Sequence, residues 1–207
     1  MENNRDSIRR NLILAYDRAA EERDGYEVAG WKLDERERFL RMLHDEGKTR
    51  LIDIGSGPGT HAVYFRENGM VVTCIDLSPG NVSRCQQKGL AAFECDVLDL
   101  QSLGEEFEAA FAMNSLLHIP RQELPGALDA IRHALAPGGL FFWGQYGGEQ
   151  SEGVFQEDHY EPKRFFSLLE DGQIIEAASG VFKLERFASF AVDKEDKLHF
   201  QSLILRA

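Results

Sequence analysis

Glycines at alternate positions follow an aspartate in the stretch Asp53-Ile54-Gly55-Ser56-Gly57-Pro58-Gly59. Glycine lets a backbone turn sharply and come close to a ligand, because no Cβ stands in the way. A short apolar run, 50–54, precedes this stretch, and a helical pattern, 60–68, follows it. A loop between a strand and the N-terminus of a helix lies at the edge where open α/β sheets bind ligands. The stretch is therefore predicted to be a ligand-binding loop.

The spacing of these glycines distinguishes between two cofactor classes. Dinucleotide-binding enzymes carry the pattern G-x-G-x-x-G or G-x-G-x-x-A. Counted from Gly55, that pattern requires Gly or Ala at position 60, where this chain has Thr60. The spacing argues against a nicotinamide-dependent enzyme on a similar sheet, which we keep as an alternative.

Two further aspartates follow predicted strands. Asp76 ends the run 71–75, where a carboxylate can accept hydrogen bonds from both ribose hydroxyls of a nucleoside. Its alternative role is to cap the helix that follows. Asp96 ends the run 91–95, where a carboxylate can accept a hydrogen bond from the exocyclic amine of adenine.

Strands and helices alternate in the central part of the sequence. The predicted strands are 50–54, 71–75, 91–95, 109–113 and 140–143, and the helices between them are 60–68, 79–88 and 122–135. This alternation predicts an α/β fold with a doubly wound, mostly parallel sheet and helices on both faces. Two longer β runs, 180–190 and 198–205, flank the charged turn Asp193–Lys197. They predict a C-terminal antiparallel hairpin on the edge of a seven-stranded sheet.

The parts outside this alternation complete one domain, 1–207. Residues 5–23 are predicted to be helical, and a second helix is expected to start near Asp34, with Glu37 completing a capping box. A last helix is expected from Pro162 through Leu169. We therefore divide the chain into an N-terminal helical cap (1–47), a cofactor-binding core (48–145), an acceptor lid (146–170) and C-terminal strands (171–207).

The lid is expected because the stretch 144–161 is longer than the usual connection of about four to six residues, and such loops tend to be functional. Its candidates for lining an acceptor pocket are Tyr146, Asp158, His159 and Tyr160. A solvated polar loop is the alternative.

Taken in order, the motifs resemble those of the class I S-adenosylmethionine-dependent methyltransferases. The likeness rests on the D-x-G-x-G-x-G loop, on Asp76 and Asp96, and on the turn Ala136-Pro137-Gly138-Gly139 before the fifth strand. It covers roughly residues 50–145. The resemblance implies a Rossmann-like fold, S-adenosylmethionine as cofactor, and methyl transfer to a small molecule with S-adenosylhomocysteine as product. A non-catalytic module that binds the cofactor is a second alternative.

The resemblance also implies roles for single residues. The expected cofactor contacts are Tyr16, Asp53, Gly55, Ser56, Gly57, Gly59, Asp76, Leu77, Asp96, Val97, Asn114 and Ser115. His118 follows the fourth strand near the expected methyl position and titrates near neutrality, so it is the candidate general base. The alternative is a histidine that packs or bonds to the backbone. Tyr26 and Trp31 are further candidates for closing over the cofactor.

Several other classes of protein are disfavoured. Ser115 follows Asn114 where amine-methylating enzymes carry a Pro-Pro pair, and no His and carboxylate cluster has ligand spacing, so we expect no metal. Three cysteines without a CxxC pair predict neither a disulfide framework nor a zinc site. A net charge of −12 argues against binding nucleic acid. With no long apolar run and a polar N-terminus, we expect no membrane association and a cytoplasmic location.

Overall fold

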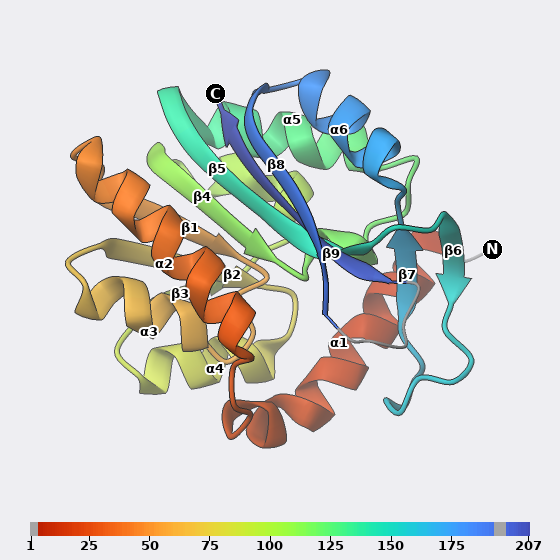
Figure 1. Cartoon of the computed structure of the whole chain (residues 1–207). Helices are drawn as coiled ribbons and strands as arrows, with labels where there is room; N and C mark the ends of the chain where they lie inside the picture. The colour runs from red at the N-terminus through yellow and green to blue at the C-terminus, as the bar shows by residue number, and fades with distance from the viewer. Residues whose placement is uncertain (1–3, 193–197) are drawn as a thin grey trace.

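The computed structural model of the chain describes residues 4–192 and 198–207, so the turn expected at Asp193–Lys197 lies outside the described residues. Its main element is a seven-stranded sheet with the order β3-β2-β1-β4-β5-β9-β8 (Figure 1). The parallel strands are β1 (Arg50–Ile54), β2 (Val71–Asp76), β3 (Ala91–Glu94), β4 (Phe107–Met113) and β5 (Leu135–Gly147). The antiparallel strands are β8 (Lys183–Ala191) and β9 (His199–Arg206). The predicted fold is confirmed.

Helices cover both faces of this sheet (Figure 1). One face carries α2 (Gly30–Asp45), α3 (Thr60–Glu67) and α4 (Pro79–Gln87). There Phe39 of α2 and Phe65 of α3 pack on Phe111 of β4, with ring centroids 6.0 and 5.1 Å from that of Phe111. The other face carries α5 (Leu124–Ala134) and α6 (Asp171–Ser179). Burial on both faces explains why β4 is almost continuously apolar.

The helix α1 (Asn4–Asp24) lies apart from both layers and covers the carboxyl ends of the parallel strands. It contacts α4, where Asp17 accepts hydrogen bonds from the Ser78 hydroxyl and from the backbone N of Gly80. A Cβ at position 80 would lie 3.0 Å from the Asp17 carboxylate and 3.3 Å from Ala20, so glycine permits this close approach. The predicted helical cap 1–47 is therefore α1, whereas α2 belongs to a covering layer.

The helix predicted from Pro162 through Leu169 is wrong. Part of that segment is the strand β7 (Phe165–Leu168), which pairs antiparallel with β6 (Ser151–Val154) in a separate two-stranded sheet. Aromatic residues favour strands, and Phe165 packs on Ile8 and Leu12 of α1. The helix lies further on, at α6, where Glu170 and Gln173 form a capping box. Residues 171–207 were expected to hold strands only.

Two other boundaries differ from the prediction. The helix α2 begins at Gly30 with Ala29 as its N-cap, so Asp34 and Glu37 lie inside the helix and form no capping box. The strand β5 continues to Gly147 because β9 pairs with it over its whole second half. The connection proposed as a lid therefore begins after Gly147 and contains the β6–β7 hairpin.

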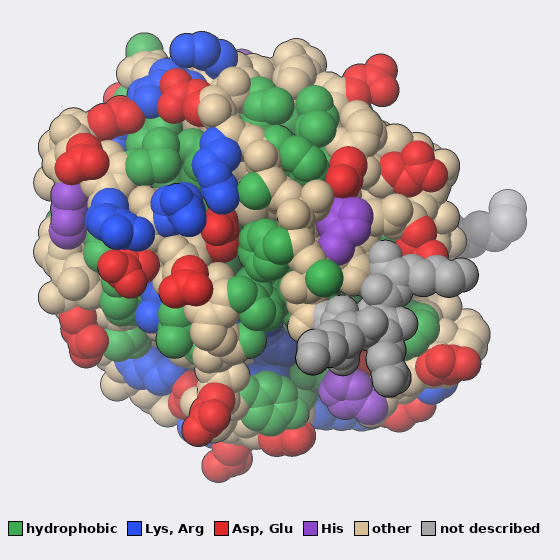
Figure 2. Space-filling model, in the orientation of Figure 1, with side chains coloured by type: hydrophobic (Ala, Val, Ile, Leu, Met, Phe, Trp, Pro, Cys, Tyr) green, Lys and Arg blue, Asp and Glu red, His purple; other side chains and the backbone are tan. Residues whose placement is uncertain are grey.

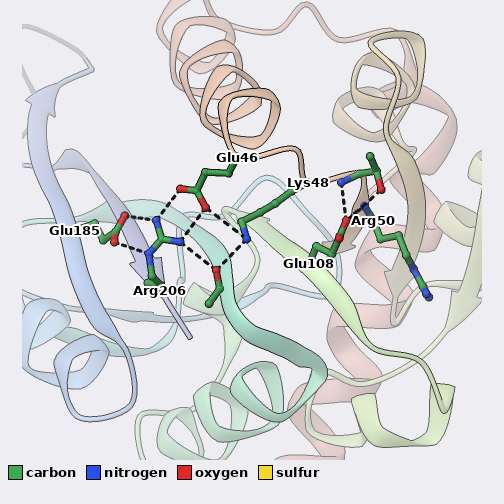
Figure 3. A network of polar contacts seen from close by, with 8 residues as sticks. Glu46, Lys48, Arg50, Glu108, Glu185 and Arg206 are labelled. Carbon is green, nitrogen blue, oxygen red and sulfur yellow. Dashed lines mark hydrogen bonds and ion pairs between the residues drawn. The ribbon is translucent and has the colours of Figure 1, made fainter.

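Ion pairs hold the amino ends of the parallel strands, at the opposite end of the sheet from the glycine loop (Figure 3). Arg206 of β9 donates to Glu46, which follows α2, and to Glu185 of β8. These contacts raise the pKa of Arg206 and lower the pKa of both glutamates. Lys48 donates to the carbonyl of Gly138 at 2.9 Å. The network therefore ties the turn between α2 and β1 to β5, β8 and β9.

Among the described helices, none has both the length and the apolar character needed to cross a bilayer.

Candidate active site

The glycine loop turns sharply between β1 and α3. Its first and last glycines have φ angles of +67° (Gly55) and +85° (Gly59), which L side chains rarely adopt. A Cβ at position 55 would lie only 2.3 Å from the Cβ of Ser115. The loop is thus packed directly on the segment that follows β4, and this contact requires glycine.

Asp76 joins the glycine loop to the start of α4. Its Oδ2 accepts a hydrogen bond from the backbone N of Gly57 at 2.9 Å, and its Oδ1 accepts from the backbone N of Ser78 at 2.9 Å. Burial raises the pKa of this carboxyl, and its hydrogen bonds partly oppose the rise. The side chain that caps α4 is Ser78, which accepts from the backbone N of Asn81 at 3.1 Å. The predicted cap and the Pro79 in the first turn are confirmed.

Of the cavities lined by α1, two meet at Gly55 and Asp76. The larger has a volume of about 290 Å³ and the smaller about 90 Å³. They share Leu12 of α1, Gly55, Asp76, Leu77, Ser115 and His118 as lining residues. Of the predicted cofactor contacts, the larger cavity is lined by Tyr16, Gly55, Ser56, Gly57, Asp76, Leu77, Asn114 and Ser115, and the smaller also by Asp96 and Val97.

Two predicted contacts, Asp53 and Gly59, line neither cavity. Gly59 is the N-cap of α3. Asp53 lies within β1 beneath the loop, and its Oδ2 atom is buried without a hydrogen-bond partner. Burial raises the pKa of this carboxyl well above its usual range, and the negative charge of Asp76 adds to the rise. Both residues therefore support the glycine loop without facing either cavity.

Asp96 is engaged by α1. Its Oδ2 atom lies 3.3 Å from Arg5 Nη2 and 3.1 Å from Arg9 Nη1, and Arg5 also pairs with Glu123 at 3.0 Å. Its Oδ1 accepts from the backbone N of Leu98, so the aspartate also caps the short helix η1 (Val97–Leu103). Two arginines of α1 thus meet the carboxylate at the wall of the smaller cavity.

His118 ends the short helix η2 (Leu116–His118) and is held on both ring nitrogens. Its Nδ1 lies 2.7 Å from the carbonyl oxygen of Phe165 and its Nε2 lies 2.5 Å from the hydroxyl of Tyr16. A carbonyl only accepts, so Nδ1 carries the proton and Nε2 accepts from Tyr16. Burial lowers the pKa of His118 to about 3. The expectation that His118 titrates near neutrality is therefore wrong.

The Tyr16 hydroxyl also accepts from Arg164 Nη1 at 3.1 Å. Arg164 in turn donates to both carboxylate oxygens of the buried Asp158, at 2.8 Å each. This pairing lowers the pKa of Asp158 to about 2. The hairpin that was expected to be an acceptor lid thus braces Tyr16 and His118. None of the lid residues predicted to line the pocket, Tyr146, Asp158, His159 and Tyr160, lines either cavity.

Comparison with known proteins identifies the fold. Residues 51–139 match the family model described as a methyltransferase domain. The chain is 29% identical over 140 residues to malonyl-acyl-carrier protein O-methyltransferase of Serratia marcescens, which aligns 67% of this chain with 54% of the relative. It is 25% identical over 151 residues to ribosomal RNA large subunit methyltransferase E of Wolbachia pipientis, with 65% of this chain and 76% of the relative covered.

The methyltransferase-domain match over residues 51–139 and the named relatives support the resemblance to the class I S-adenosylmethionine-dependent methyltransferases. The chain spans about half the length of its Serratia relative. The solved 1,6-didemethyltoxoflavin-N1-methyltransferase of Burkholderia thailandensis superposes on all of this chain and on 91% of its own, with a TM-score of 0.70 at 21% identity. That structure supports the expected Rossmann-like fold.

Three basic residues that line the larger cavity were not predicted from the sequence: Arg23, Lys32 and His61. Each lines the larger cavity, although Arg23 and Lys32 lie in helical stretches where a charged residue usually faces solvent. Burial, with the positive charges of Arg36 and Lys32, lowers the pKa of His61 to about 3. No motif pointed to these residues. Of the two further aromatic candidates, the exposed Tyr26 lines the cavity and the half-buried Trp31 does not.

Proposed function

We propose that this methyltransferase binds S-adenosylmethionine across the two cavities and transfers its methyl group to a small molecule, with S-adenosylhomocysteine as product. The observation that carries the proposal is the position of Asp76. Its carboxylate is hydrogen-bonded to the glycine loop and lines both cavities, as a residue that holds the ribose between adenine and methionine should.

The residues present suit such a ligand. The smaller cavity has apolar walls, among them Leu77 and Val97, and carries the carboxylate of Asp96, which matches a flat base with an exocyclic amine. In the larger cavity, the buried atoms Asn114 Oδ1 and Ser115 Oγ have no hydrogen-bond partner. Unpaired buried polar atoms are costly, so these two favour a ligand with polar groups of its own.

When bound, S-adenosylmethionine supplies a methyl group on a positively charged sulfur for in-line displacement by the acceptor. The chain's own contribution is to hold the acceptor close and to keep water out, which can supply most of the rate enhancement. Neutral His118 positions the Tyr16 hydroxyl at the cavity wall. We assign His118 as a positioning residue, because its Nε2 lone pair already accepts from Tyr16.

A small acceptor is favoured by the enclosure of the site and by charge. The α1 helix and the β6–β7 hairpin stand over the carboxyl ends of the strands (Figure 1). On the face drawn in Figure 2, Lys and Arg side chains are interspersed with Asp and Glu side chains and form no continuous basic surface. With a net charge of −12, the chain repels a phosphate backbone at long range. One relative is a ribosomal RNA methyltransferase by name, so RNA is a comparison arm in the test.

Two measurements test the proposal in sequence. Calorimetric titration with S-adenosylhomocysteine should show binding, and titration with NAD should show none; the reverse result rejects the cofactor. Transfer of radiolabelled methyl groups is then measured with a fractionated small-molecule extract and, separately, with ribosomal RNA. Label in the RNA rejects a small acceptor. Cofactor binding without transfer to either supports the non-catalytic binding module.

A further inference from the structure

Two basic residues, Arg23 and Lys32, line the larger cavity. Neighbouring cations are paired: Arg164 with Asp158, and Lys88 with Asp24. Among the residues that the structure describes, Arg23 and Lys32 form no ion pair, and the ammonium of Lys32 makes no hydrogen bond. The Nε atom of Arg23 is buried without a partner. Two acidic residues, Glu27 and Asp76, line the same cavity, but within the part of the chain that the structure describes neither forms an ion pair with Arg23 or Lys32.

The two cations occupy different places in the cavity. The guanidinium of Arg23 lies over the glycine loop, with Nη2 3.7 Å from the position that a Cβ of Gly57 would take. The ammonium of Lys32 lies over aromatic faces instead, 5.2 Å from the ring centroid of Trp31 and 5.8 Å from that of Tyr146. Tyr146 belongs to β5, so Lys32 stands on the side of the cavity nearer that strand.

Charge balance then limits what the cavity holds. S-adenosylmethionine has one carboxylate, an ammonium group and a sulfonium, so it brings a net positive charge. Its carboxylate can neutralise one of the two cations and leaves the other beside a ligand that is itself positive. Burial and the charge of Arg23 already lower the pKa of Lys32. An anionic group on a second ligand would therefore be favoured beside Lys32.

We propose that Lys32 binds an anionic group of the methyl acceptor, such as a carboxylate or phenolate, while Arg23 binds the carboxylate of the cofactor. The rings of Trp31 and Tyr146 lie beneath the Lys32 ammonium and do not line the cavity, so they position the lysine and the acceptor is recognised by its charge. The inference rests on the proposed function and names its acceptor class. An acceptor whose anionic group is itself the nucleophile has no proton to lose and needs no general base, which agrees with the lack of a free lone pair on His118.

Two nucleosides show which of the two cations binds the carboxylate of the cofactor. S-adenosylhomocysteine carries the amino-acid group, and 5′-methylthioadenosine lacks it. Arg23→Gln should weaken binding of S-adenosylhomocysteine about tenfold or more and leave 5′-methylthioadenosine nearly unchanged, because a charge-assisted contact is lost. Lys32→Met should change neither affinity by more than about twofold. Selective loss of S-adenosylhomocysteine binding in Lys32→Met assigns this lysine to the cofactor and overturns the proposal.

The acceptor's anion is probed with benzoate and its neutral counterpart benzamide, titrated into protein saturated with S-adenosylhomocysteine. The wild type should bind benzoate about tenfold more tightly than benzamide. Lys32→Met should abolish this preference and Lys32→Arg should retain it. Lys183→Met is the matched control, since the Lys183 side chain is 75% exposed on β8 and its loss changes the net charge equally. Equal binding of both probes by the wild type, or a preference that survives in Lys32→Met, contradicts the proposal.

The failure of this inference is distinguishable from failure of the proposed function. Before the methyl-transfer assay, the extract is passed over an anion exchanger at neutral pH. Acceptor activity in the retained fraction supports an anionic acceptor, and activity only in the unretained fraction overturns it while methyl transfer itself stands. If no fraction is methylated, the proposed function fails, and the benzoate comparison decides the anion site by itself.

Discussion

The Tyr16 hydroxyl lies 2.5 Å from Nε2 of His118, and Nδ1 of the same imidazole lies 2.7 Å from the carbonyl oxygen of Phe165. This pair of contacts links α1, η2 and β7, which are far apart along the chain. Because both nitrogens are used, the ring stays neutral and fixed in one tautomer. Its effects on stability and on rate can therefore be separated.

Mild acidification should lower the free energy of unfolding, because His118 binds a proton more readily in the unfolded state. Its folded-state pKa is about 3, whereas an unfolded histidine has a pKa of about 6.5. Stability from this group is thus complete above about pH 6.5 and is lost as the pH falls toward 3, because the unfolded state binds the proton first. Between pH 7 and pH 5 the loss should be about 2 kcal/mol. Urea unfolding of wild type and His118→Asn at both pH values measures it, and equal losses in the two proteins would contradict the assignment.

Catalysis should depend on His118 through Tyr16. Tyr16→Phe and His118→Asn should each lower kcat by more than they weaken binding of S-adenosylhomocysteine, because Asp76 and Asp96, the proposed partners of the ribose and the adenine, lie on other elements. The double variant should have a kcat only slightly lower than that of either single variant, because both changes break the same hydrogen bond between Tyr16 and His118. The rate–pH profile of the wild type should have no inflection from an imidazole near pH 6–7. Additive losses, or an inflection there that disappears in His118→Asn, would restore His118 as a general base.

The ion pair between Asp158 and Arg164 should stabilise the β6–β7 hairpin. The Asp158 side chain is only 1% exposed, so Asp158→Asn leaves a buried guanidinium without its charge partner. The free energy of unfolding should fall by about 3–5 kcal/mol, the usual cost of breaking a buried pair. Glu161→Gln in the same connection is the control, since that carboxylate is 70% exposed, and it should cost less than about 1 kcal/mol. Similar costs for the two variants would mean that the pair is dispensable.

Asp76→Asn should weaken binding of S-adenosylhomocysteine by about 1–3 kcal/mol, because it removes a charged acceptor. The exposed Asp99 offers the control Asp99→Asn, for which we expect unchanged affinity. Isothermal titration calorimetry measures both. Unchanged affinity in Asp76→Asn would remove Asp76 from the ribose site.

A methyl group at Gly55 should disrupt the loop more than one at Gly69, although both glycines have positive φ. Gly69→Ala meets no atom within 4 Å and should cost about 1 kcal/mol of backbone strain. Gly55→Ala places its Cβ 2.3 Å from Ser115 and must move one of the two segments. We expect it to lower both the melting temperature and cofactor affinity. Equal effects of the two variants on both measurements would show that the segment at Ser115 can move away from the glycine loop without loss of stability or affinity.

The elements predicted correctly are those whose signals are local. The Ser78-Pro79 helix start, the glycine loop and the apolar strands each depend on residues within one turn or one strand. The β6–β7 hairpin was missed because its strands are held by long-range packing, for example of Phe165 on α1. The state of His118 was missed for the same reason, since its partner Tyr16 is 102 residues away. The unpaired charge of Lys32 is visible only once the fold shows what surrounds it.

The order of the last two strands has a consequence for how the chain is made. β9 lies between β5 and β8, and β8 pairs with no strand other than β9 in the described sheet. During synthesis, β5 and β8 emerge from the ribosome before residues 199–206 do. Until those residues arrive, both strands expose unpaired backbone edges, which are the usual template for association with other chains. The sheet therefore cannot be completed until β9 has been made. Nascent chains that end before β9 should be the ones that associate most readily with other chains or with a chaperone.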